Sequence, residues 1–207
     1  MKVVLLHALP FDERMWEPQV AALADYDVVT PRLYGRGRSI AEWAESLVAE
    51  LDGELALVGA SMGGYCALEM ARRVPERTRG VALVGSRAGA DPPSRRAERD
   101  DVIHKLRTQG HEAVWPEYDP QDPEELAIAV EALRDRGDAS DVVASLQAPL
   151  LVCVGTADAL TSVDEAREIA ASAPNGRVEV FEGAGHIIGF DQPERLTEVL
   201  VGFVRSL

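Results

Sequence analysis

The chain is poor in cysteine, in aromatic residues and in basic side chains. Among its 207 residues there are only two cysteines, and aromatic residues make up 5%. Cys66 and Cys153 both fall inside segments that we expect to be a helix and a strand. We therefore interpret them as buried, reduced thiols rather than as a disulfide or a nucleophile.

Basic residues are outnumbered by acidic ones, 21 to 35, which gives a net charge of -14. This charge opposes the binding of nucleic acid and of anionic lipid surfaces, so we expect neither as a partner. No apolar run approaches the roughly 18 residues of a membrane span. Residues Lys2 to His7 lack the long apolar region and cleavage site of a secretory signal. We therefore predict a cytoplasmic protein.

Hydrophobic residues, at 46% of the chain, are sufficient for one compact domain over residues 1–207. Short apolar runs, most of them rich in β-branched residues, alternate with helical patterns, which predicts an α/β fold. We expect a mostly parallel sheet of about six strands with helices on both faces. The predicted strands are Lys2 to His7, Tyr26 to Thr30, Glu54 to Gly59, Arg79 to Gly85, Pro149 to Gly155 and Arg177 to Glu182.

Helix start signals support this alternation. Capping boxes, in which side chains satisfy the first free amides of a helix, are predicted at Ser39 with Glu42 and at Ser162 with Glu165. Asp122, which precedes Pro123, indicates a third helix start.

Residues 92–147 contain no predicted strand and interrupt the pattern. Two amphipathic helices are expected there, at Arg95 to Gln109 and at Glu124 to Arg136, joined by the polar stretch Trp115 to Pro123. Long insertions of this kind are often functional, so we interpret the segment as a helical cap. The alternative is an ordinary crossover of packed helices with no role in substrate binding.

The strongest chemical signal is the sequence Gly59-Ala60-Ser61-Met62-Gly63, between the third predicted strand and a helix. A G-x-S-x-G motif in this context is typical of a nucleophilic serine on a tight turn, because the glycines let the strand and the helix approach closely. The alternative is a glycine-rich turn that contains a serine by chance.

A serine nucleophile needs a base and a group that orients the base. His186 follows the last predicted strand and Asp158 follows the one before it, so both are expected at the carboxyl edge of the sheet. Each residue alone is also consistent with an ordinary loop. The competing histidines and acids, which fit less well, are His104, His111, Asp91 and Asp164.

These segments, together with Leu5-Leu6-His7-Ala8-Leu9 and the loop from Pro31 to Ser39, resemble the α/β-hydrolase superfamily. The resemblance covers nearly the whole chain outside residues 92–147. It implies a serine hydrolase, specifically a carboxylic ester hydrolase that cleaves a small ester or lactone. It also implies a cap over the pocket and neither cofactor nor metal.

The resemblance also assigns roles. Ser61, Asp158 and His186 follow the order nucleophile, acid, histidine of the superfamily's catalytic triad. The backbone amides of Leu9 and Met62 are the candidates for the oxyanion hole. Where many members have His-Gly after the first strand, this chain has His7-Ala8, and we interpret His7 as a structural histidine that fixes this loop by hydrogen bonding.

Substrate identity is less defined by the sequence. Trp115 and Tyr118 are candidate pocket residues, although aromatics in a helical insertion often belong to the core. One of Arg32, Arg36 and Arg38 is a candidate for binding a carboxylate-bearing substrate, with solvated arginines as the alternative.

Two further functions are compatible with the same residues. One keeps the triad but breaks a carbon–carbon bond or acts as a lyase, and the other is a non-catalytic receptor for a small ligand. In all cases we expect a small-molecule partner, and the oligomeric state stays open.

Overall fold

A computed structural model describes residues 1–207 and contains one six-stranded sheet in the order β2-β1-β3-β4-β5-β6. Every pair of neighbouring strands is parallel, which confirms the predicted fold class. Each observed strand end differs from the predicted one by at most one residue. The strands are β1 Lys2–Leu6, β2 Asp27–Val29, β3 Leu55–Ala60, β4 Thr78–Val84, β5 Leu150–Gly155 and β6 Gly176–Phe181.

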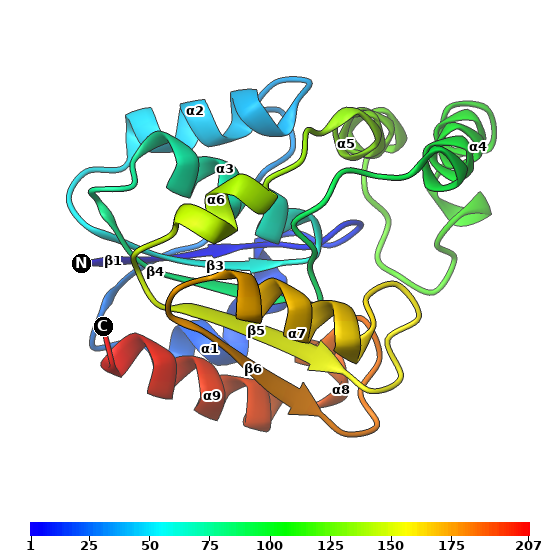
Figure 1. The fold of residues 1–207 in the computed structure, drawn as a ribbon. Helices are drawn as coiled ribbons and strands as arrows, with labels where there is room; N and C mark the ends of the chain where they lie inside the picture. The colour runs from blue at the N-terminus through cyan, green and yellow to red at the C-terminus, as the bar shows by residue number, and fades with distance from the viewer.

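Helices cover both faces of the sheet (Figure 1). On one face lie α2 Ile40–Glu50, α3 Met62–Arg73, α6 Ser140–Ser145 and α7 Val163–Ser172. On the other face lie the 3₁₀ turn η1 Glu13–Trp16 and the helices α1 Glu17–Ala22, α8 Ile188–Asp191 and α9 Pro193–Arg205. Because side chains alternate along a strand, Leu55 and Leu57 of β3 enter one core cluster while Ala56 and Val58 enter the other.

The chain reverses its direction of travel across the sheet between β1 and β3. From β1 it first adds β2 on one side and then returns to place β3 on the other side. Ligands of open parallel sheets bind at such a point, outside the carboxyl ends of the strands. The loops after β1 and after β3 therefore meet at the expected place for a site.

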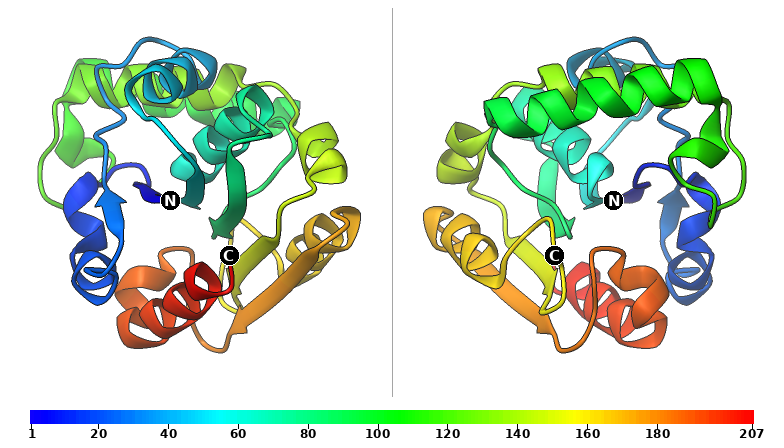
Figure 2. Two further views of the ribbon diagram at one scale, coloured as in Figure 1. Left: turned by 90° about the vertical axis from the view of Figure 1, so that its left-hand side faces the viewer. Right: turned by 90° about the vertical axis from the view of Figure 1, so that its right-hand side faces the viewer.

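All the regular secondary structure between β4 and β5 is helical. It contains α4 Pro93–Gln109, the 3₁₀ turn η2 His111–Ala113, α5 Pro123–Asp135 and the short α6, which the sequence did not predict. Figure 2 shows α4 crossing the end of the molecule at which the strands finish, whereas both chain termini lie at the opposite end. We call residues 93–135 the α4–α5 layer.

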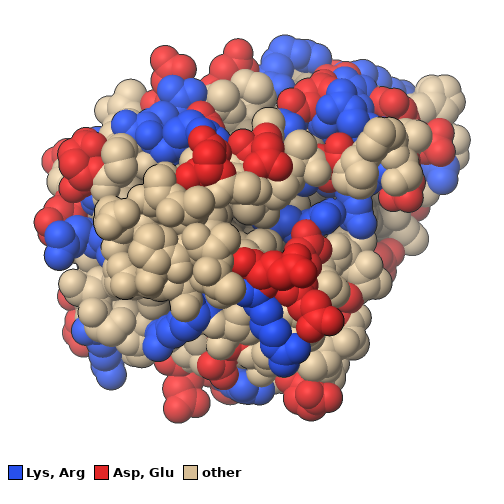
Figure 3. All heavy atoms as spheres, viewed as in Figure 1, with Lys and Arg blue, Asp and Glu red and all other residues tan.

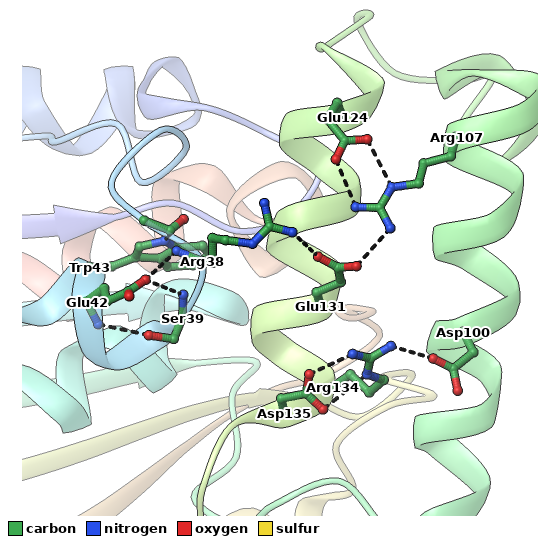
Figure 4. Close-up of polar contacts among 11 residues, drawn as sticks. Arg38, Ser39, Glu42, Trp43, Asp100, Arg107, Glu124, Glu131, Arg134 and Asp135 are labelled. Carbon is green, nitrogen blue, oxygen red and sulfur yellow. Dashed lines mark hydrogen bonds and ion pairs between the residues drawn. The ribbon is translucent and has the colours of Figure 1, made fainter.

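Ion pairs join the two helices of this layer (Figure 4). Arg107 of α4 contacts both Glu124 and Glu131 of α5, each at 2.8 Å. Arg38, in the loop before α2, also reaches Glu131, at 2.9 Å. The layer is thus connected to the rest of the molecule partly through exposed charges.

Two of the three predicted helix starts are confirmed in full. Ser39 and Glu42 form both halves of the capping box, and Asp122 accepts from the first free amides of α5. The capping box at Ser162 is wrong in one half. The Ser162 hydroxyl accepts a hydrogen bond from the amide of Glu165. The Glu165 carboxylate, however, accepts from Nε of Arg87 at 2.5 Å and not from the backbone amide of Ser162.

Both cysteines are fully buried and unpaired, as expected. Burial raises the pKa of the Cys66 thiol to about 12 and raises that of Cys153 further. No helix combines the length and the apolar character that crossing a membrane requires.

Candidate active site

Ser61 occupies a strained turn between β3 and α3. Its φ of 44° and ψ of -109° make it the only non-glycine residue with a positive φ. The turn requires glycine on both sides of Ser61, because a Cβ on Gly59 would lie 2.3 Å from the carbonyl carbon of Gly63. A Cβ on Gly63 would lie 2.1 Å from the carbonyl oxygen of Leu6 in β1. Only glycine at these positions lets α3 start so close to the sheet.

The structure brings Ser61, His186 and Asp158 into one hydrogen-bonded chain. Nε2 of His186 lies 2.9 Å from Oγ of Ser61, and Nδ1 lies 3.0 and 3.1 Å from the two carboxylate oxygens of Asp158. The three residues follow β3, β6 and β5 respectively, at the same edge of the sheet. With Nδ1–H donating to the carboxylate, Nε2 is left as the acceptor for the serine hydroxyl.

The Asp158 side chain is fully buried, yet its charged form is favoured. Burial raises its pKa, but the hydrogen bond from His186 and those from two backbone amides outweigh burial, so the pKa lies below its ordinary value. These amides belong to Leu160, at 2.7 Å, and Thr161, at 3.0 Å. The carboxylate is therefore ionised at neutral pH and fixed in orientation.

The loop that carries His186 is fixed by contacts that the sequence did not reveal. Oδ2 of Asp191 accepts from the amide of Gly185 at 2.7 Å. The amide of Ala157 donates to the carbonyl of Ala184 at 2.9 Å, which joins the aspartate loop to the histidine loop. No motif in the sequence indicated Asp191, because its partner is a backbone amide.

The amides of Leu9 and Met62 have no acceptor within the protein. Leu9 follows β1, and Met62 is the first residue of α3, whose positive end faces the serine. The neighbouring Ala8 amide differs, because it contacts Sδ of Met15 at 3.2 Å. Two free donors thus follow β1 and β3, one in the loop after β1 and one at the start of α3.

His7 is completely buried and connects two loops. Its Nε2 accepts from the amide of Leu33 at 2.9 Å, and its Nδ1 lies 3.1 Å from the carbonyl oxygen of Ala8. Burial lowers the pKa of His7 to about 4, so the ring is neutral near pH 7. These contacts agree with a structural role rather than with proton transfer to a substrate.

A cavity of about 360 Å³ opens above Ser61 and His186. Trp115 and Tyr118 line it, as do Phe11 and Leu160. The Tyr118 ring packs edge-on against Phe11 at 4.7 Å, while Trp115 also contacts the main core cluster. The apolar part of the lining thus takes side chains from the α4–α5 layer as well as from the strand-end loops.

The arginines that the sequence singled out do not line this cavity. Arg32 pairs with Glu125 at 2.8 Å, Arg36 with Glu50 at 2.6 Å, and Arg38 with Glu131 at 2.9 Å. The hypothesis that one of them binds substrate is therefore corrected. The arginines on the cavity wall are Arg87, Arg95 and Arg99, from β4's carboxyl-end loop and from α4.

The competing histidines and acids lie elsewhere. Asp91 is buried between Arg99 and Arg136, at 2.8 Å from the latter, and Asp164 pairs with Arg167 on the surface at 3.0 Å. His104 is exposed on α4, and His111, the first residue of η2, is buried within the α4–α5 layer. No group of three or more metal-binding side chains is present.

A family model described as "Alpha/beta hydrolase family" matches residues 3–199. The 3-oxoadipate enol-lactonase 1 of Acinetobacter baylyi is 24% identical over 99% of this chain and 89% of its own length. The pimeloyl-[acyl-carrier protein] methyl ester esterase of Aromatoleum aromaticum is 25% identical over 99% of this chain and 98% of its own.

A solved structure of a thermophilic esterase from Thermogutta terrifontis, with malate bound, shares the fold. It superposes with a TM-score of 0.89 at 28% identity and covers all of this chain and 90% of its own. The enol-lactonase from Burkholderia xenovorans LB400 gives a TM-score of 0.84 at 25% identity, over 99% of this chain and 91% of its own. Both superpositions include the helical segment between β4 and β5.

Proposed function

The chain belongs to the alpha/beta hydrolase family, and from that premise we propose that it is a serine hydrolase that cleaves a small carboxylic ester or lactone. Ser61 is the nucleophile, His186 the general base and Asp158 the residue that orients the histidine. The observation that carries the proposal is the continuous hydrogen-bonded chain from the Ser61 hydroxyl through His186 to the buried Asp158, at the base of a cavity.

In the first half of the reaction, Oγ of Ser61 attacks the substrate carbonyl while its proton passes to Nε2 of His186. The negative charge that forms on the carbonyl oxygen is stabilised by the amides of Met62 and Leu9, which are free to donate. Asp158 stabilises the charged imidazole. When the intermediate collapses, the bond between the carbonyl carbon and the alkoxy oxygen breaks, and His186 returns the proton to that oxygen.

In the second half, water attacks the acyl-enzyme. His186 takes a proton from the water, the second tetrahedral intermediate collapses, and the bond to Oγ breaks as the proton returns to Ser61. The acid product then leaves. With a lactone the acid and the alcohol belong to one molecule, so a single open-chain hydroxy acid is released.

The substrate class is supported by the names of two relatives and by the size of the cavity. One relative is named an enol-lactonase and the other a methyl ester esterase, so both names denote cleavage of an ester linkage. A cavity of about 360 Å³ is at the small end of the usual range for ligand sites. A compact acyl or lactone group fits this volume better than a long lipid chain.

Residues 92–147 act in this proposal as a cap within a single domain. The support is that α4 and the stretch after η2 contribute much of the cavity wall, including Val102, Trp115 and Tyr118. Substrate binding is expected to exclude water from Ser61 most effectively where these side chains close over it.

The test is labelling with a fluorophosphonate, which forms a covalent bond with an activated serine. We expect the native protein to be labelled, Ser61→Ala to lose the label and the matched control Ser94→Ala, exposed on α4, to keep it. Ser61→Ala should also lose at least about 10³-fold in turnover of 4-nitrophenyl acetate while keeping its fold.

Each other outcome of this test identifies an alternative. Absence of labelling in the native protein, combined with ligand binding, favours a receptor. Labelling without hydrolysis of any member of a panel of esters, thioesters and lactones favours carbon–carbon cleavage or lyase chemistry.

A further inference from the structure

We propose that the cavity contains a carboxylate-binding subsite formed by Arg87, Arg95 and Arg99, and that the natural substrate is an ester or lactone that carries a second, ionised carboxyl group. The inference rests on the proposed function and narrows its substrate class. All three arginines line the same cavity as Ser61 and His186.

The three side chains reach the cavity from two elements. Arg87 follows the end of β4, while Arg95 and Arg99 are four residues apart on α4 and therefore lie on one face of that helix. Val102, one turn further, continues this face and also lines the cavity. In the space-filling view, basic side chains gather in the recess beneath α4 and α5, next to acidic ones (Figure 3).

Two of these arginines are held in place by buried or half-buried acids. Nε of Arg87 donates to Glu165 at 2.5 Å, and Nε of Arg99 donates to Asp91, whose side chain is fully buried. Each bond uses only Nε, so the terminal amino groups of both guanidinium groups have no hydrogen-bond partner within the protein. An arginine fixed at Nε presents its remaining donors with little loss of side-chain entropy.

Arg95 differs from most arginines of the chain. It forms no ion pair and no side-chain hydrogen bond, although most of the others have an acidic partner within 4.0 Å. Its side chain is half-buried in the cavity wall. A half-buried guanidinium group without a partner is costly unless a ligand supplies one.

The arginines around the cavity carry more positive charge than their acidic partners balance. Glu165 pairs with Arg87, but Asp91 is shared between Arg99 and Arg136, and Arg95 has no acidic partner, so an anionic group of the substrate is favoured here. The planar fork of arginine also fits the two oxygens of a carboxylate. Glu98 and Glu117 line the cavity too, but both are exposed, so water screens their charges.

The net charge of the whole protein provides no long-range attraction for an anionic substrate. A net charge of -14 repels an anionic substrate at a distance, so attraction must act inside the cavity. The screening length is about 8 Å at physiological salt. Arg87, Arg95 and Arg99 line the cavity itself, whereas Arg32, Arg36 and Arg38 do not line it and are paired with acids.

The test compares two esters that differ by one carboxyl group, mono-4-nitrophenyl glutarate and 4-nitrophenyl pentanoate. We expect the native enzyme to have a higher kcat/KM for the glutarate ester than for the pentanoate ester. The ratio of these two kcat/KM values should fall about tenfold in the Arg95→Gln variant. Arg95→Lys, which keeps the charge, should lose less. Lys105→Gln removes the same charge from an exposed site on α4 and should leave the ratio unchanged.

A binding measurement separates this inference from the proposed function. Calorimetry with monomethyl glutarate on Ser61→Ala should show binding that weakens about tenfold when Arg95→Gln is added. If the native enzyme hydrolyses both esters with a ratio that Arg95→Gln does not change, the subsite is overturned and the hydrolase stands. If neither ester is hydrolysed but binding still depends on Arg95, the subsite stands and the hydrolase falls.

Discussion

Gly63→Ala tests whether close contact between α3 and β1 positions the nucleophile. The added methyl carbon would lie 2.1 Å from the carbonyl oxygen of Leu6 and 2.5 Å from its carbonyl carbon. Ordinary contact distances exceed the first value by more than about 1 Å, and both obstacles are backbone atoms that no rotamer change removes. The start of α3 must therefore move away from β1.

The expected magnitude follows from two opposing effects. Overpacking a rigid site costs up to about 3 kcal/mol, whereas replacing glycine by alanine within a helix contributes about 1 kcal/mol in the other direction. We expect a net loss of about 2 kcal/mol in the free energy of unfolding, measured by urea denaturation. Displacement of Ser61 by about 1 Å should also lower kcat for 4-nitrophenyl acetate roughly 10²-fold.

Gly202→Ala in α9 is the matched control, because no atom lies within 4 Å of the Cβ it would add. This variant should be up to about 1 kcal/mol more stable than the native protein and equally active. A Gly63→Ala variant with native stability and native kcat would refute the reasoning.

Two more predictions concern buried titratable groups. Asp158→Asn should fold but lose about 10³- to 10⁴-fold in kcat, because a neutral amide neither fixes the required tautomer of His186 nor stabilises its charged form; a kcat within tenfold of native would contradict this role. Burial lowers the pKa of His7 to about 4, so between that value and the ordinary 6.5 the unfolded chain binds more protons than the folded one. The free energy of unfolding should fall by up to about 3 kcal/mol as pH decreases through this window. In urea titrations at several pH values His7→Gln should lack this slope, and an unchanged slope would assign it to other groups.

The sequence was sufficient to predict the sheet, because parallel strands that are buried on both faces appear as short apolar runs. β3 and β5 are buried at every position, and their predicted bounds shift by at most one residue. The tight turn at Ser61 could also be predicted from the sequence, because the local backbone geometry of such a turn requires its glycines. His186 and Asp158 were found because they follow strands, and strand ends meet at one edge of a parallel sheet.

The sequence did not predict which charged side chains line the cavity. Arg32, Arg36 and Arg38 form a conspicuous cluster in the sequence, but all three are paired with acids. The partners of Arg32 and Arg38, Glu125 and Glu131, lie far away along the chain, and Arg36 pairs with Glu50 at the end of the following helix. Conversely, Arg95 and Arg99 stand among other charged residues of α4, and only the packing of that helix decides which of them face the cavity. Pairing between distant side chains leaves no periodic signal.

Both termini lie at the amino end of the strands, on the far side of the molecule from Ser61 (Figure 2). A tag, a fused partner or a surface anchor attached to Met1 or to Leu207 would therefore leave the mouth of the cavity facing away from the attachment. Immobilised preparations made through either terminus should accept substrate equally well. The fold in this way offers two independent handles for building the protein into larger assemblies.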